Sequence, residues 1–153
     1  MFNSQFAIDR LILFDFKGNT FSYEFEPGLN YIKGRNDSGK TQFFEFIDFM
    51  LGKRSEDIGA RRWYKDTLQS GRLELHSGNN CCILTRSLDN RVFRCLRNGV
   101  ALPVESLADY CEAIDSFFCE SFDKRRMLNA FMEQNITYRT LVTYNLLRTF
   151  TAA

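Results

Sequence analysis

Several features that would assign this chain to a familiar class are scarce. Its 153 residues include one histidine and five cysteines, no two of them in C-x-x-C spacing, so neither a zinc site nor a disulfide framework is expected. The formal net charge is only +1, so any DNA contact would need a local basic patch. The apolar runs are too short to span a bilayer, and no basic-then-apolar leader opens the chain. We therefore expect a cytoplasmic protein with buried free thiols and no membrane partner.

Aromatic residues are abundant instead, with 16 Phe, 6 Tyr and 1 Trp. Hydrophobic residues make up 44% of the chain and charged residues 25%, which is ordinary for a globular protein of this size. A chain so rich in Phe can bury a large core and still leave apolar surface for a partner.

Three strands are predicted in the first part of the chain. Residues 6–16 and 20–25 are rich in β-forming residues, and the second run alternates polar and apolar positions. Residues 29–33 predict a short strand that leads into Gly34. From Lys40 the pattern changes to a helix that is apolar on most sides, as a buried helix is, with Gly52 as its stop.

The remaining pattern predicts a β-meander over about residues 68–100 and a helical part over about 104–150. The meander's strands are expected at residues 72–76, 81–86 and 91–96, between Asn- and Gly-rich turns. Ser106 and Asp109 resemble a capping box that begins a helix. Residues 122–134 predict another helix, and residues 136–150 are ambiguous between helix and strand.

The segment with a chemical signature is Gly34-Arg-Asn-Asp-Ser-Gly-Lys-Thr41, which matches G-x-x-x-x-G-K-S/T at every fixed position. Its glycines let backbone N–H groups point inward, beside a helix N-terminus that favours anions. Lys40 would reach the β- and γ-phosphates of ATP, and the Thr41 hydroxyl would coordinate Mg²⁺. The predicted nucleotide-binding residues are Gly34, Arg35, Asn36, Asp37, Ser38, Gly39, Lys40 and Thr41. A glycine turn with an incidental lysine is the alternative.

The stretch from Ile8 to Leu51 resembles the N-terminal lobe of SMC-like ABC ATPases. This group includes the SMC proteins, RecF, RecN and related AAA-domain ATPases of bacterial DNA repair and phage defence. The likeness rests on the first strand, the segment Pro27-Gly-Leu-Asn30, the P-loop and the helix that follows. It extends less specifically over most of residues 6–118.

The resemblance implies an α/β fold: one incomplete P-loop ATPase lobe over residues 1–153, with an antiparallel meander and flanking helices. In these families ATP lies between two heads, and each head is built from two lobes. The implied partners are therefore a C-terminal ATPase lobe or second subunit, a second copy in a homodimer of heads, and DNA. The implied location is the cytoplasm, at the nucleoid where the heads meet DNA.

Residues for hydrolysis are harder to find. No apolar strand ending in Asp-Glu follows the P-loop, so the chain alone is expected to bind nucleotide weakly and hydrolyse it poorly. Gln134 is a candidate for the glutamine that senses Mg²⁺ and the attacking water, although a solvated glutamine is the more ordinary interpretation. Residues 68–72 echo the family's signature motif but lead into a strand, so we reject them.

Basic residues outside the motif have two interpretations each. Arg61, Arg62 and Lys65 flank two aromatic residues and could contact a DNA backbone. Alternatively, they belong to a loop whose Trp63 packs on the core while the charges are solvated. Lys17, just after the first strand, could approach the nucleotide or be an exposed turn lysine.

Two other function classes stay open. A small P-loop kinase needs a lid and an acceptor site, and a GTPase needs a guanine-reading motif such as N-K-x-D, which is absent. A non-catalytic module, in which nucleotide only stabilises an interaction scaffold, is the second alternative.

Overall fold

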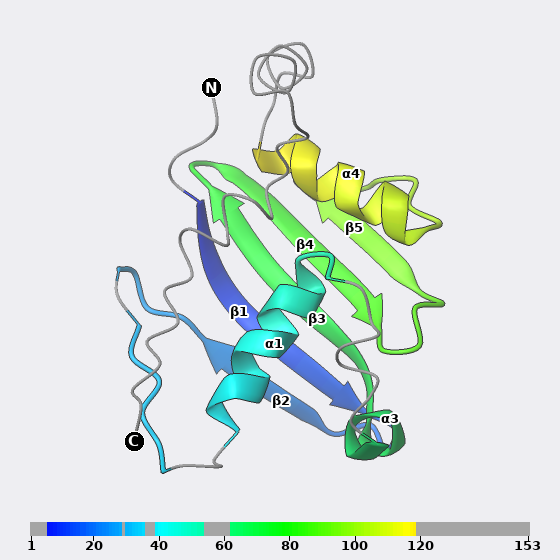
Figure 1. Cartoon of the computed structure of the whole chain (residues 1–153). Helices are drawn as coiled ribbons and strands as arrows, with labels where there is room; N and C mark the ends of the chain where they lie inside the picture. The colour runs from blue at the N-terminus through cyan, green and yellow to red at the C-terminus, as the bar shows by residue number, and fades with distance from the viewer. Residues whose placement is uncertain (1–5, 29, 36–38, 54–61, 119–153) are drawn as a thin grey trace, which may run out of the picture.

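The computed structural model describes residues 6–28, 30–35, 39–53 and 62–118 of the chain (Figure 1). Strands and helices follow one another in the order β1, β2, α1, α3, β3, β4, β5, β6 and α4. Their bounds are β1 Phe6–Asp15, β2 Thr20–Glu24, α1 Lys40–Met50, α3 Arg62–Thr67, β3 Leu68–Ser77, β4 Asn80–Ser87, β5 Phe93–Arg97, β6 Val100–Ala101 and α4 Leu107–Phe118.

The described strands form one six-stranded sheet in the order β2-β1-β3-β4-β5-β6, and every neighbouring pair is antiparallel. Alternate residues of β3 and β4 are buried, so the sheet has one core face. Helices α1 and α4 lie across this face in Figure 1. The result is a mixed α/β fold with an antiparallel sheet, as the sequence predicted.

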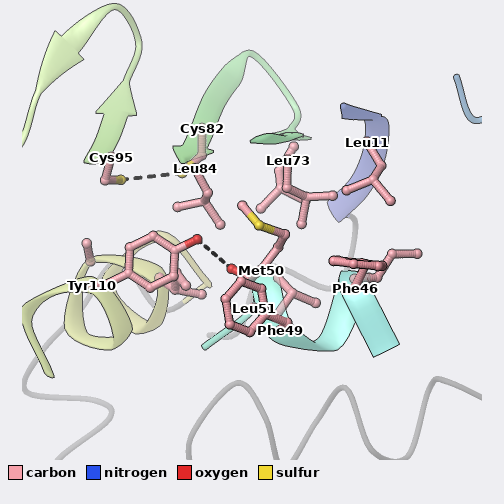
Figure 2. Close-up of a cluster of buried hydrophobic side chains, with 14 of the residues drawn as sticks. Leu11, Phe46, Phe49, Met50, Leu51, Leu73, Cys82, Leu84, Cys95 and Tyr110 are labelled. Atoms are coloured by element: carbon pink, nitrogen blue, oxygen red, sulfur yellow. Dashed lines mark hydrogen bonds between the residues drawn. The ribbon is translucent and has the colours of Figure 1, made fainter. Parts of the chain in front are cut away.

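The core gathers between this face and the two helices. Figure 2 shows side chains from β1, β3, β4 and β5 meeting residues of α1 and α4. The fully buried members include Leu11, Phe49, Met50, Leu73, Leu84, Tyr110 and Ile114. Because the core takes residues from every large element, no strand or helix of the described part would hold its position alone.

The thiols in the described part are all free, but the expected burial holds only for Cys82 and Cys95, since Cys111 is half-buried and Cys81 is exposed. Cys119 lies outside the described residues. Cys82 and Cys95 are buried on neighbouring strands with their sulfur atoms 3.7 Å apart (Figure 2). The hydrogen bond with Cys95, together with burial, raises the pKa of Cys82. A thiol in this setting stays protonated and behaves as a small apolar side chain.

The predicted meander and capping box are confirmed. Strands β3, β4 and β5 cover the expected runs, although β5 begins at Phe93 rather than at Arg91. The N–H groups of Arg91 and Val92 donate to the Ser87 hydroxyl at 3.1 and 2.9 Å, so both residues belong to the hairpin turn.

The cap at the start of α4 is reciprocal. Asp109 N–H donates to Ser106 Oγ at 3.1 Å, and Ser106 N–H donates to Asp109 Oδ2 at 3.0 Å. The Ser106 hydroxyl also donates to Asp109 Oδ2 at 2.8 Å. Asp thus does the work of the Glu more usual at this position.

The predicted strand over residues 29–33 is wrong for residues 30–33, which have no regular secondary structure. The Asn30 side chain instead closes a loop: its Oδ1 accepts from Glu26 N–H at 2.8 Å, and its Nδ2 donates to the Glu26 carbonyl at 2.8 Å. Asn competes with strand pairing in this way because its amide can pair with nearby backbone.

The loop considered as an alternative for residues 61–65 is not formed over residues 62–65, because residues 62–67 form helix α3. Tyr64 is buried and packs edge-on against Phe46 of α1, with ring centroids 5.0 Å apart. The predicted helix at residues 122–134 and the ambiguous segment at 136–150 lie outside the described residues.

Helix α1 approaches β3 closely at Gly71. A Cβ atom at this position would lie 2.7 Å from Met50 Sδ and 3.5 Å from Leu13 Cδ2. The glycine of residues 68–72, within β3, therefore serves close packing, in agreement with our rejection of a signature motif there.

We predict that Gly71→Ala lowers the free energy of unfolding by about 1–3 kcal/mol, because the added methyl must displace Met50. Urea denaturation measures the effect. Ser70→Ala, one residue away on the opposite face, is the matched control and should stay within about 0.5 kcal/mol of wild type. Equal stability of Gly71→Ala and wild type would contradict this account of the contact.

We predict that the contribution of Asp109 to stability depends on pH. The Ser106 hydroxyl, more than any other group, lowers the pKa of Asp109 below its ordinary value of 3.8. The stabilisation is therefore fully present above pH 3.8 and is lost as the pH falls through the lowered folded-state pKa. Urea denaturation at a series of pH values should show wild type and Asp109→Ala converging in acid. A constant difference across that range would refute the prediction.

Candidate phosphate-binding site

The motif at residues 34–41 lies where an irregular loop enters helix α1. Gly34 and Arg35 end the described part of that loop, and Gly39 is the N-cap of α1. Asn36, Asp37 and Ser38 lie outside the described residues. The two sides of the motif are thus a backbone loop and a helix N-terminus.

Gly39 has the left-handed conformation, with φ 84° and ψ 7°. Glycine adopts this conformation without steric cost, so the chain can turn sharply into the helix. The first helical hydrogen bond follows at once, from Phe43 N–H to the Gly39 carbonyl at 3.0 Å. The first turn of α1 contains no acidic residue. Its N–H dipoles therefore favour an anion with no neighbouring carboxylate in that turn to oppose it.

Lys40 folds back over the loop. Its Nζ donates hydrogen bonds to the carbonyl oxygens of Gly34 at 2.6 Å and Arg35 at 2.5 Å. The ammonium group is thus held beside the backbone of its own motif, next to the helix N-terminus. Thr41 follows on the first turn of α1 and is exposed.

Aromatic rings anchor the first turns of α1. Phe43 packs edge-on against Tyr23 of β2, with ring centroids 5.0 Å apart, and its ring lies 5.9 Å from that of Phe25. Tyr23 and Phe25 also contact each other at 4.9 Å. This cluster joins the start of α1 to the edge strand of the sheet.

Lys17 lies in the turn between β1 and β2. Its N–H donates to Asp15 Oδ1 at 2.8 Å, and the N–H and side-chain amide of Asn19 both donate to the Asp15 carboxylate at 2.7 Å. These hydrogen bonds lower the pKa of Asp15, and the one from the Asn19 side-chain amide has the largest effect. Among the hydrogen bonds of the described residues, none joins Lys17 to the motif, so its approach to a nucleotide stays a prediction.

The other predicted site residues are only partly described. The backbone of Arg62 and Lys65 belongs to α3, but their side chains lie outside the described part. Arg61 and Gln134 lie outside it altogether. Helix α3 does sit beside the turn that carries Lys17, because Phe16 N–H donates to the Thr67 carbonyl at 3.3 Å. A DNA contact there stays a prediction.

Sequence reasoning missed two residues that contact the far end of α1. Arg86 donates to the Phe49 carbonyl at 2.5 Å, and the Tyr110 hydroxyl donates to the Met50 carbonyl at 2.6 Å. One signal was present in the pattern of β4, where Cys82 and Leu84 occupy core positions and alternation places Arg86 on the same face. A charged residue in a core position implies a specific polar partner.

The comparison with known families agrees with the motif. A family model described as an AAA domain matches residues 13–138, which is more than half of the chain. The chain belongs to this AAA-domain family. Membership indicates an AAA-type, P-loop ATPase-like module that binds nucleotide. The search of curated proteins found no match.

The residues present fit the phosphates of a nucleotide, which membership in this family implies. The fit rests on the Lys40 ammonium beside the loop backbone, the left-handed Gly39 and the first turn of α1, which has no acidic residue.

None of the described helices is both long enough and apolar enough to cross a membrane.

Proposed function

We propose that this chain is the ATP-binding part of an SMC-like ATPase head, which dimerises on ATP and acts on DNA. The observation that carries its nucleotide-binding part is the position of Lys40 Nζ, held at 2.5–2.6 Å by two loop carbonyls beside the N-terminus of α1, and the SMC-like role rests on the sequence resemblance. A cation so placed is available to a phosphate that enters the loop.

Binding would proceed by exchange of partners. Lys40 would release the Gly34 and Arg35 carbonyls and donate to phosphate oxygens, while the first N–H groups of α1 add their dipole. The Thr41 hydroxyl, exposed on the same turn, would take Mg²⁺ as a ligand. Bound ATP would supply the phosphoanhydride bond whose hydrolysis changes the state of the head.

Hydrolysis is proposed to need more than these residues. The sequence has no apolar strand ending in Asp-Glu after the motif, so we propose that a C-terminal lobe or a second subunit supplies the group that activates water. If no such partner exists, the non-catalytic nucleotide-binding module is the better description. Turnover measured with and without a candidate partner distinguishes the two.

The DNA role is proposed from the resemblance and from where the basic residues lie. The backbone of Arg62 and Lys65 belongs to α3, which is hydrogen-bonded to the turn that carries Lys17. Basic residues carried by adjoining segments of backbone would contact phosphates without reading sequence.

We predict that Lys40→Ala raises the Kd for ATP with Mg²⁺ by about 10- to 100-fold, because hydrogen bonds to a charged group contribute about 1.5–3 kcal/mol. Isothermal titration calorimetry measures it. Lys33→Ala removes the same charge from an exposed position just before the motif and should bind as wild type does. A Lys40→Ala protein that binds as tightly as wild type would refute the proposed site.

We predict that Thr41→Val removes most of the dependence of ATP affinity on Mg²⁺, since valine keeps the shape of threonine but lacks its hydroxyl. Titrations with and without Mg²⁺ should then nearly coincide. Thr41→Ser retains the hydroxyl and should keep the dependence. If Thr41→Val still needs Mg²⁺ as wild type does, Thr41 is not the metal ligand.

A further inference from the structure

The C-terminal end of helix α1 is held by side chains from two other elements. The last carbonyls of a helix have no partner within the helix. Here Arg86 Nη1 of β4 donates to the carbonyls of Phe49 at 2.5 Å and Lys53 at 2.6 Å. The Tyr110 hydroxyl of α4 donates to the Met50 carbonyl at 2.6 Å, as the dashed line in Figure 2 shows.

Arg86 is built into the core rather than resting on it. It is 0% exposed, and its guanidinium lies 3.8 Å from the centroid of the Phe49 ring. Its Nε donates to Asn90 Oδ1 at 2.9 Å, which connects the β4–β5 turn to the same end of α1. Burying a cation costs free energy unless it gains strong directed contacts. The carbonyl end of a helix, with its negative dipole, provides such contacts.

Tyr110 contacts the C-terminal end of α1 from helix α4. It is also 0% exposed, and its ring packs against Phe93 of β5 with centroids 5.6 Å apart. Apolar packing of Phe46, Ile47 and Met50 keeps α1 on the sheet but is not directional. The hydrogen bonds from Arg86 and Tyr110 are directional, so they set how far α1 is rotated and shifted along its axis.

We propose that Arg86 and Tyr110 are positioning residues for the phosphate-binding site, an inference that rests on the proposed function. Helix α1 runs without interruption from Lys40 to Met50, a length of roughly 16 Å. A rotation or shift at its last turn is therefore transmitted to Gly39, Lys40 and Thr41 at its first. Neither positioning residue touches nucleotide; both act through the helix. Hydrogen bonds to phosphate oxygens weaken when their donors move out of range or out of line, so such a displacement would weaken phosphate binding.

The test compares Tyr110→Phe and Arg86→Met with wild type, using the full chain at a temperature at which circular dichroism shows each protein folded. We expect Tyr110→Phe to raise the Kd for ATP with Mg²⁺ by about fivefold to tenfold. Arg86→Met should raise it further, since it removes the hydrogen bond and the cation–π contact with Phe49 of α1 and the hydrogen bond with Lys53 just after the helix. Arg86→Lys, which keeps a donor and the charge, should recover part of the loss.

A matched control separates positioning from stability. Asn98→Ala removes the hydrogen bond from Cys81 N–H to Asn98 Oδ1, 2.8 Å long, at the β5–β6 turn, and this bond involves neither α1 nor α4. It should bind ATP as wild type does. In nucleotide-free protein, the NMR amide signals of Gly39 and Lys40 should move in Tyr110→Phe and stay in place in Asn98→Ala.

Each outcome decides a different question. If wild type binds ATP, Lys40→Ala binds it more weakly, and folded Tyr110→Phe and Arg86→Met both bind as wild type does, the positioning role is wrong while the proposed function stands. If Arg86→Met fails to fold, Tyr110→Phe decides by itself. If wild type binds no ATP with Mg²⁺, the proposed function fails and the positioning role fails with it.

Discussion

The packing of helix α1 against the antiparallel sheet is the contact on which the candidate site depends. Met50 occupies the space that Gly71 leaves open, and a methyl group there would lie 2.7 Å from its sulfur. Phe46, Ile47 and Phe49 bury the same side of the helix. Because the motif opens directly into α1, this packing sets where the helix that follows the motif lies.

The two ends of α1 are complementary in charge. Its N-terminus begins at a left-handed glycine with no acidic residue in the first turn, and it holds the Lys40 ammonium nearby. Its C-terminus is met by the buried guanidinium of Arg86. A cation at the carbonyl end is favourable to the helix dipole, and the other end is left to attract an anion. Arg86 thus stabilises the C-terminus of α1, while its N-terminus favours binding of an anion.

Family membership and fold describe different levels of this molecule. The AAA-domain match supports nucleotide binding, whereas the described strands form an entirely antiparallel sheet. Residues 29–33 predict a short strand that leads into the motif. So short a run of residues cannot tell whether a neighbouring strand is available, and here Asn30 pairs with the Glu26 backbone instead. A local side-chain contact therefore overrode a strand pattern.

The sequence by itself determined the features that depend on neighbouring residues: the glycine turn into α1, the Ser106–Asp109 cap and the hairpins of the meander. Each is set by backbone conformation or by hydrogen bonds across a few positions. Only the tertiary structure decided that Arg86 and Tyr110 meet the same helix end, that Gly71 receives Met50, and that Tyr64 packs on Phe46. Those contacts join residues far apart in the chain, and they exist only once the sheet has brought its strands together.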